Sequence, residues 1–86
     1  MIIKYHSKFK KQYKKLDSKG KDQFRVRINL FESDPTNPKL RLHPLKGQYG
    51  GYWSINISGD LRALFYYESE AIVVFALIGT HSQLYG

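Results

Sequence analysis

The chain has 86 residues, no cysteine and a formal net charge of +7. A chain this short feeds one hydrophobic core, so we expect a single domain over residues 1–86, and its 42% hydrophobic content argues against disorder. The lack of cysteine excludes disulfides and thiolate metal sites, and no apolar run reaches the length of a membrane span or resembles a signal peptide, so a cytoplasmic location is expected.

The charge is divided unevenly along the chain. Residues 1–46 hold 13 of the 14 Lys and Arg with four acids (+9), whereas residues 47–86 hold one Arg and three acids (−2). A basic surface of this kind attracts polyanions, which makes nucleic acid the leading class of partner. A basic helical surface that serves only solubility, or that binds an acidic protein, is the alternative.

The first half predicts a strand followed by two helices. Ile2, Ile3 and Tyr5 indicate a short strand, and Ser7 is expected to cap a helix that runs to about Leu16. Its apolar stripe is Phe9, Tyr13 and Leu16, and its other positions are rich in lysine, namely Lys8, Lys10, Lys11, Lys14 and Lys15.

A second helix is predicted from about Lys21 to Glu32, after a break at Asp17, Ser18 and Gly20. Its stripe is Phe24, Ile28 and Phe31, and Pro35 and Pro38 follow it and stop the helix. Two helices with a short join form an antiparallel hairpin, and each stripe needs another layer to cover it.

The second half predicts that layer. Trp53 to Ile57 alternates in polarity, Ser58-Gly59 offers a tight turn, and Leu61 to Tyr67 reads as the return strand. Ala71 to Ile78 is apolar on both faces, as in a central strand. The order β-α-α-β-β-β gives an α+β fold, in which the N-terminal helical hairpin covers one face of a small, mostly antiparallel sheet and leaves the other face partly open.

Few residues are candidates for chemistry, because the chain has no phosphate-binding glycine loop, no nucleophile elbow and no metal-ligand spacing. His43 precedes the meander and could project from the rim of the sheet, and His81 lies where the last strand leaves it. An ordinary surface histidine and a turn histidine are the alternatives. His6 is given no role.

Asp60 and Arg62 are two residues apart, so they are expected to share a face of the return strand. A guanidinium among aromatic side chains suits a phosphate, although a plain surface ion pair is the alternative. The tyrosines could stack on unpaired bases, and Trp53 is expected in the core with Ile55 and Ile57.

These motifs, in this order, resemble the YafQ branch of RelE-type toxins. They are Leu42-His43-Pro44-Leu45-Lys46-Gly47, Gly51-Tyr52, Gly59-Asp60-Leu61-Arg62 and Gly79-Thr80-His81-Ser82-Gln83-Leu84-Tyr85-Gly86. The resemblance spans nearly the whole chain and implies a RelE-like fold. It also implies a toxin of a type II toxin-antitoxin system that cleaves mRNA in the ribosomal decoding site without a cofactor, and that an antitoxin silences.

The resemblance also assigns roles. It places His43, Asp60 and His81 at acid-base positions, Arg62 at a phosphate-binding position and Tyr85 at a terminal aromatic position, and Tyr85, Asn56 and Lys46 are expected to contact substrate. The lysines of the first helix are expected to bind ribosomal RNA. The implied partners are an antitoxin, the 70S ribosome with its mRNA, and operator DNA through the antitoxin complex, with no membrane.

Two positions depart from the pattern, since Asn56 stands where a histidine is usual and Leu77 where an arginine is usual. A ParE-like protein that binds gyrase and cleaves no RNA is the runner-up, and an inactive relative is a third reading. Codon preference, the antitoxin and the stoichiometry of the complex are not encoded in this sequence.

Overall fold

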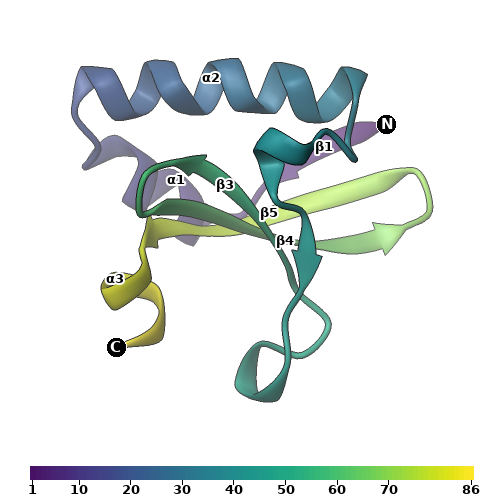
Figure 1. The fold of residues 1–86 in the computed structure, drawn as a ribbon. Helices are drawn as coiled ribbons and strands as arrows, with labels where there is room; N and C mark the ends of the chain where they lie inside the picture. Colours follow the sequence, from purple (N-terminus) through teal and green to yellow (C-terminus); the bar gives the residue numbers. More distant parts are fainter.

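The meander predicted for the second half forms the middle of a five-stranded sheet in the computed structural model, which describes residues 1–86 (Figure 1). The strand order is β1-β5-β4-β3-β2, in which β3 spans Trp53–Ser58, β4 spans Leu61–Ser69 and β5 spans Ile72–Thr80. Strand β1 (Ile2–Tyr5) pairs with β5 in parallel, and the other pairs are antiparallel. The predicted α+β class and the mostly antiparallel sheet are confirmed.

The two predicted helices form one layer on this sheet, as Figure 1 shows for α2 above the strands. Helix α1 spans Ser7–Lys14 and is capped by His6, whose Nδ1 accepts a hydrogen bond from the Lys8 amide at 3.1 Å. The expected cap, Ser7, is instead the first helical residue. His6 therefore has a structural role that the sequence did not indicate.

Helix α2 spans Ser18–Ser33 and begins three residues earlier than predicted. The carboxylate of Asp17 accepts a hydrogen bond from the Gly20 amide at 2.7 Å, and so caps the helix. A Cβ at Gly20 would lie 3.1 Å from that carboxylate oxygen, so the glycine leaves room for the cap. Residues that read as a break in the pattern are thus the start of the helix.

The core lies between the helices and the sheet. Phe9, Phe24 and Phe31 are buried against Phe65 of β4 and Phe75 of β5, with ring centroids of neighbouring pairs 5.1 to 6.0 Å apart. Each ring removed from water contributes on the order of 2 kcal/mol. The helical stripes were predicted correctly, and Trp53 packs against this core, as expected.

Two short elements were not predicted. Strand β2 (His43–Pro44) pairs with Ser54 and Trp53 of β3, and helix α3 (His81–Tyr85) follows β5 directly. Their two and five residues are too few for a periodic pattern. The connection to β2 contains a 3₁₀ turn, η1 (Pro38–Leu40), and a second turn, η2 (Gly47–Tyr49), precedes β3.

The second face of the sheet is covered only in part. In Figure 1, α3 and the segment around η2 lie on the side of the strands away from α2. Leu84 of α3 is buried, and Tyr49 of η2 donates a hydrogen bond from its hydroxyl to the Leu84 carbonyl at 2.7 Å. The partly open face that the sequence predicted is therefore present, and it is bordered by these two segments.

None of the helices in the structure has the length and apolar character needed to cross a lipid bilayer.

Candidate functional site

The turn between β3 and β4 and the end of β5 bring three of the predicted residues together. Arg62 is directly opposite Gly79 in the β4–β5 ladder, and His81 follows two residues after Gly79. The carboxylate of Asp60 accepts a hydrogen bond from the Arg62 guanidinium at 3.3 Å with one oxygen and from the His81 amide at 3.3 Å with the other. One carboxylate therefore holds both the cation and the start of α3.

The sequence suggested that Asp60 belongs to the return strand, but Asp60 lies outside it. It occupies the turn before β4, because β4 begins at Leu61 and Gly59 adopts a φ of +45°. Its side chain still reaches Arg62 by folding back along the turn. The Asp60 side chain is 60% exposed and that of Arg62 is 27% exposed, so the pair contributes under about 1 kcal/mol to stability. Its contribution is positional.

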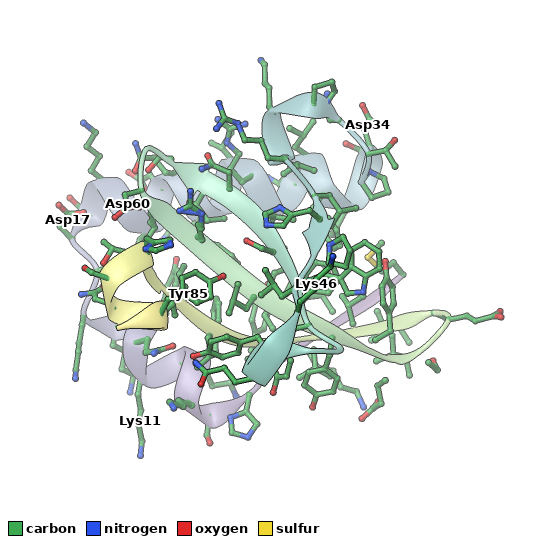
Figure 2. The ribbon with its side chains drawn as sticks, turned by 60° about the horizontal axis from the view of Figure 1, so that its bottom comes forward. Lys11, Asp17, Asp34, Lys46, Asp60 and Tyr85 are labelled. Atoms are coloured by element: carbon green, nitrogen blue, oxygen red, sulfur yellow. The ribbon has the colours of Figure 1, made fainter.

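Helix α3 presents the last two predicted residues on one side. Thr80 and Gln83 form a reciprocal capping box that fixes the start of the helix. His81 and Tyr85 are four residues apart, so they share a helical face, and their ring centroids are 4.8 Å apart. Figure 2 shows Tyr85 on α3 and Asp60 beside it at the turn.

The electrostatics of Tyr85 reflect its neighbours. Burial raises the pKa of its hydroxyl above the ordinary value of 10.0, the Arg62 guanidinium lowers it, and Tyr49 raises it. The hydroxyl is therefore protonated near neutral pH and can donate a hydrogen bond. The Asp60 carboxylate contacts Arg62 and the His81 amide, and the His81 ring contacts that of Tyr85, so Asp60, Arg62, His81 and Tyr85 form one cluster, called here the acid-base cluster.

His43 lies on the same face of the sheet, on the edge strand β2. It is opposite Ser54, two residues from Asn56, and Asn56 is opposite Arg62. Strands about 4.8 Å apart and a two-residue advance of about 6.7 Å place the Cα atoms of His43 and Arg62 roughly 12 Å apart. His43 is thus across β3 from the acid-base cluster rather than in contact with it.

The hydrogen bond of His43 fixes its tautomer. Its Nδ1 is 2.7 Å from the carbonyl oxygen of Arg41, which can only accept, so the proton of the neutral ring is on Nδ1. The free Nε2 then carries the lone pair of a base. Arg41 presents that carbonyl from a left-handed conformation with φ of 48°, which is uncommon for a residue with a side chain.

Two predicted substrate contacts are less direct. Asn56 is opposite Arg62, but its side-chain amide donates to the Gly59 carbonyl at 3.1 Å and so stabilises the β3–β4 turn. Lys46 is exposed at the start of η2, and Figure 2 shows it away from the Asp60 turn. The predicted role of Lys46 in binding substrate stays a prediction.

The five lysines of the first helix do not form a single surface. Lys10 and Lys14 border an apolar groove of about 420 Å³ between α1 and α2, whereas Lys8 lies at a different groove beside Tyr52 and Tyr66. Lys11 and Lys15 are exposed, and Figure 2 shows Lys11 on α1, away from the acid-base cluster. Their predicted contact with ribosomal RNA stays a prediction.

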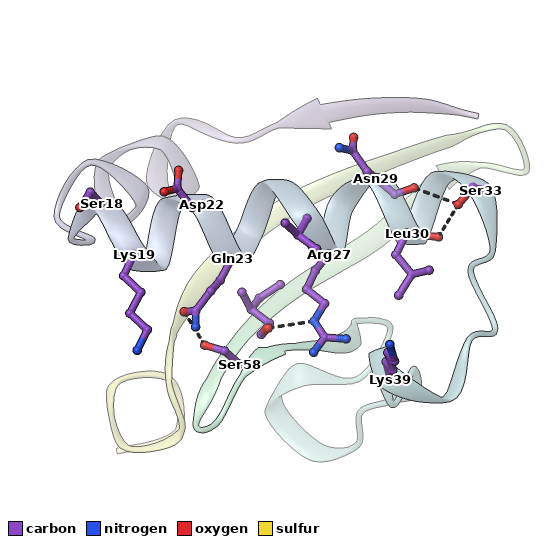
Figure 3. Close-up of a pocket in the computed structure, with 12 residues that line it drawn as sticks. Ser18, Lys19, Asp22, Gln23, Arg27, Asn29, Leu30, Ser33, Lys39 and Ser58 are labelled. Carbon is purple, nitrogen blue, oxygen red and sulfur yellow. Dashed lines mark hydrogen bonds between the residues drawn. The ribbon is translucent and has the colours of Figure 1, made fainter.

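A groove of about 870 Å³ between α2 and β3 does not contain any predicted site residue (Figure 3). Arg27 donates to the Ile57 carbonyl across this groove, and Gln23 accepts from the Ser58 hydroxyl. These contacts attach α2 to the edge of the sheet, so we regard the groove as part of the helix-sheet packing. The acid-base cluster lies outside this groove, and its Asp60 and His81 are exposed.

The arrangement offers groups for acid-base chemistry, with an imidazole that has a free Nε2, a second imidazole beside a phenol, and a half-buried guanidinium. No three histidine or carboxylate side chains are grouped closely enough to hold a metal ion. Sequence reasoning also missed the structural role of Tyr49, since nothing in the sequence links Tyr49 to Leu84, 35 positions away. Its contact holds α3 against the sheet.

Comparison with known proteins places the chain in a family. A family model described as "Bacterial toxin of type II toxin-antitoxin system, YafQ" matches residues 1–86. The crystal structure of YafQ from E. coli strain BL21(DE3) is similar, with a TM-score of 0.83 and 20% identity over 98% of this chain and 97% of that one. No match was found among curated protein sequences.

Two other structures share the fold. YafQ in the E. coli DinJ-YafQ toxin-antitoxin complex has a TM-score of 0.81 and 22% identity, covering 98% of this chain and 96% of that one. The YoeB/ParE toxin from Agrobacterium tumefaciens has a TM-score of 0.76 and 19% identity, covering 94% and 99%. At these identities the structures support the fold, whereas the family model spans the whole chain. The chain therefore belongs to the YafQ family of bacterial toxins of type II toxin-antitoxin systems.

Proposed function

We propose that this toxin is a ribosome-dependent endoribonuclease that cleaves mRNA in the decoding site and so inhibits translation. The observation that carries the proposal is the Asp60 carboxylate, which joins Arg62 to the His81 segment on the open face of the sheet. An imidazole and a guanidinium on segments that one carboxylate joins suit an RNA linkage, since RNA cleavage needs a proton donor and a cation at the same phosphate.

The reaction uses the nucleophile that RNA itself carries. His43 accepts the proton of the 2′-hydroxyl through its free Nε2, and the 2′-oxygen attacks the adjacent phosphorus. The bond from phosphorus to the 5′-oxygen breaks, and His81 donates a proton to that oxygen. The products are a 2′,3′-cyclic phosphate and a 5′-hydroxyl. No electrons are transferred, and the chemistry requires an acid, a base and a positive charge.

The remaining residues balance charge and fix geometry. Arg62 donates hydrogen bonds to the phosphate oxygens, whose negative charge grows in the transition state. Asp60 is a positioning residue here, because both of its oxygens already accept hydrogen bonds from Arg62 and the His81 amide. Tyr85 keeps its proton and can stack on a base or donate to the phosphate.

In this proposal, the separation of His43 from the acid-base cluster explains why cleavage requires the ribosome. With Cα atoms of His43 and Arg62 roughly 12 Å apart, both groups reach one linkage only if the RNA is held across β3 in a fixed conformation. In this proposal the decoding site holds the mRNA in such a fixed conformation. A rigid substrate then supplies the alignment that free RNA lacks.

The partners follow from the same proposal. The related E. coli YafQ forms a complex with DinJ, and we infer a cognate antitoxin for this toxin as well. The 70S ribosome supplies mRNA and ribosomal RNA, and operator DNA is contacted only through the antitoxin complex. All these partners are in the cytoplasm.

Primer extension on one mRNA in a translating extract tests the proposal. We expect cuts at codon positions when the purified toxin and 70S ribosomes are both present, and intact mRNA when the ribosomes are omitted. Cuts of equal strength without ribosomes would contradict the ribosome dependence. Intact mRNA throughout, together with inhibition of gyrase supercoiling, would favour the ParE-like alternative instead.

A further inference from the structure

A row of aromatic rings runs along the open face away from the acid-base cluster. From Tyr85 the row continues through Tyr49, Tyr52 and Tyr66, with successive ring centroids 5.4, 6.0 and 5.6 Å apart. Each pair is close to edge-to-face, with interplanar angles of 64° to 82°. Rings packed in this way hold each other in place, so the last rings of the row form a rigid surface.

The far end of the row opens into a groove of about 620 Å³. It is lined by Tyr49 and Tyr52 from the segment around η2, by Tyr66 and Leu77 from the sheet, and by His6 and Lys8 at the start of the chain's first helix, α1. The groove therefore brings together segments from the beginning, the middle and the end of the chain. It lies next to the acid-base cluster through Tyr49, which contacts Tyr85.

Two glycines line this groove. Gly50 and Gly51 form part of its wall, and Gly51 has a φ of +90°, a conformation that residues with a side chain rarely adopt. A Cβ placed at Gly51 would meet no atom within 4 Å, so the backbone there faces open space. A flat ligand can approach the main chain and the tyrosine rings at this point.

The charge of the groove selects the kind of ligand. Its lining contains an ammonium group, Lys8, and an imidazole, His6, but no carboxylate. Lys8 takes part in none of the ion pairs of the protein, which join Lys4, Arg25 and Arg62 to acids. The combination of aromatic faces and an unpaired cation fits a ligand with a flat aromatic part and a negative part.

We propose that this tyrosine groove is a subsite for single-stranded RNA, in which an unpaired base near the cleaved linkage, but not adjacent to it, stacks on Tyr52 or Tyr66 while Lys8 contacts its phosphate. The choice of RNA rests on the proposed function. Aromatic side chains bind unpaired bases with little sequence preference, and a lysine supplies charge without geometric demands. Tyr66 and Arg62 are four residues apart on β4, about 13 Å, so the subsite positions the strand so that a linkage farther along it lies over Arg62 and His81.

Binding of an uncleavable RNA tests the subsite without any catalysis. The probe is a hexanucleotide with 2′-O-methyl groups, which removes the nucleophile, and its affinity for the full chain is measured by fluorescence anisotropy at several salt concentrations. Tyr66→Leu removes the aromatic face but keeps an apolar side chain, so we expect affinity to fall about tenfold. Tyr66→Phe keeps the face and should bind like the original protein.

Lys8→Gln gives an independent measure. Removing one cation from the phosphate should reduce the slope of log affinity against log salt by about 0.7, the value for single strands. Lys10→Gln is the matched control, since it removes the same charge from the same helix but at the groove between the helices. If the slope falls equally in both variants, Lys8 attracts RNA only through its charge, like Lys10, and its assigned phosphate contact is wrong.

Melting temperatures accompany every variant. If Tyr66→Leu fails to fold, NMR spectra of the original protein test the subsite instead. Stacking of a base should shift the ring resonances of Tyr52 and Tyr66 when the probe is added. Unshifted tyrosine rings, or a folded Tyr66→Leu variant with unchanged affinity, would overturn the subsite.

The same variants separate this inference from the proposed function. If the original protein cuts mRNA on ribosomes but the affinity for the probe does not depend on Tyr66 and Lys8, the subsite is wrong and the proposed nuclease function is retained. If the probe binds through both residues but no mRNA is cut, the subsite stands and the nuclease proposal fails.

Discussion

The imidazole of His81 is positioned from two directions, by the Asp60 carboxylate at its amide and by the Tyr85 ring. If it protonates the leaving 5′-oxygen, His81→Ala should lower the single-turnover rate of mRNA cleavage on ribosomes by about 10² to 10⁴-fold. His81 is exposed, so the melting temperature should change little. A folded variant that still cuts at the original rate would remove His81 from the mechanism.

At Leu77 a substitution can add a charged group to the site, whereas His81→Ala removes a group. It is opposite Leu64, two residues before Gly79, so its Cα lies roughly 8 Å from that of Arg62 on the same face. Leu77→Arg would add a second cation near the phosphate, and we expect cleavage at saturating ribosome concentration to rise about tenfold, which equals about 1.4 kcal/mol.

Leu77→Gln is the control for that variant, because it adds polarity without charge. An unchanged rate in a folded Leu77→Arg variant would show that Arg62 alone balances the charge on the phosphate. A gain in both variants would point to a change in packing around this half-buried position rather than to charge.

One side chain of helix α1 makes a hydrogen bond to the backbone of strand β5. Strand β1 pairs with β5 only from Ile72 to Phe75, so the continuation of β5 toward His81 lacks a neighbouring strand on that side. Gln12 of α1 accepts a hydrogen bond from the Ile78 amide at 2.9 Å and supplies the missing acceptor. The segment that carries His81 is held to the helical layer by this contact.

Gln12→Leu should therefore destabilise the protein by about 1 to 3 kcal/mol, since it leaves the amide of the buried Ile78 without a partner. Gln12→Glu keeps an acceptor and should cost less. Urea denaturation measures the difference as a lower midpoint with an unchanged slope. Equal stability of the Leu variant and the original protein would mean that the β5 amide finds another partner.

Sequence patterns predicted the elements with long apolar stripes. The stripe of Phe24, Ile28 and Phe31 indicated the second helix, and the alternation from Trp53 to Ile57 indicated a strand, because burial on one face imposes a period. Helix α3 and strand β2 have no such period. They form because Tyr49 holds Leu84 and because His43 pairs with Ser54, and these contacts join distant parts of the chain.

Local sequence patterns were also insufficient to predict the geometry of the candidate site. The residue types and the family resemblance named His43, Asp60, Arg62 and His81, but the proximity of Arg62 to His81 depends on the β4–β5 register, which local patterns do not encode. The bridging position of Asp60 and the tautomer of His43 also required coordinates. The catalytic roles of these residues stay predictions.

Across the whole molecule, charge and chemistry occupy different sides. The two basic helices form the layer on one face of the sheet, whereas α3 lies on the other side (Figure 1), and Asp60 joins the start of α3 to Arg62. A toxin that only captured free RNA at its catalytic face would gain little from cations behind the sheet. A toxin enclosed by ribosomal RNA would use both sides, since the cations of the helical layer other than Lys8 would then meet phosphates that are not the substrate.

This division predicts a specific response to salt. Ribosome affinity of the original protein should fall steeply with ionic strength, and the slope of log affinity against log salt should decrease by about 0.7 to 0.9 for each phosphate that a variant no longer neutralises. Lys11→Gln and Lys15→Gln remove exposed cations of the first helical segment, far from His81 in the chain. Affinity for ribosomes, measured by sedimentation at several salt concentrations, should weaken in both.

The cleavage rate at saturating ribosomes should stay unchanged in the same two variants, because under the proposed function these lysines orient the toxin without touching the linkage. An original protein whose ribosome affinity is insensitive to salt would place the lysines against antitoxin or solvent instead. A lower saturating rate in Lys11→Gln would bring the helical layer into the chemistry, against the separation seen in the fold.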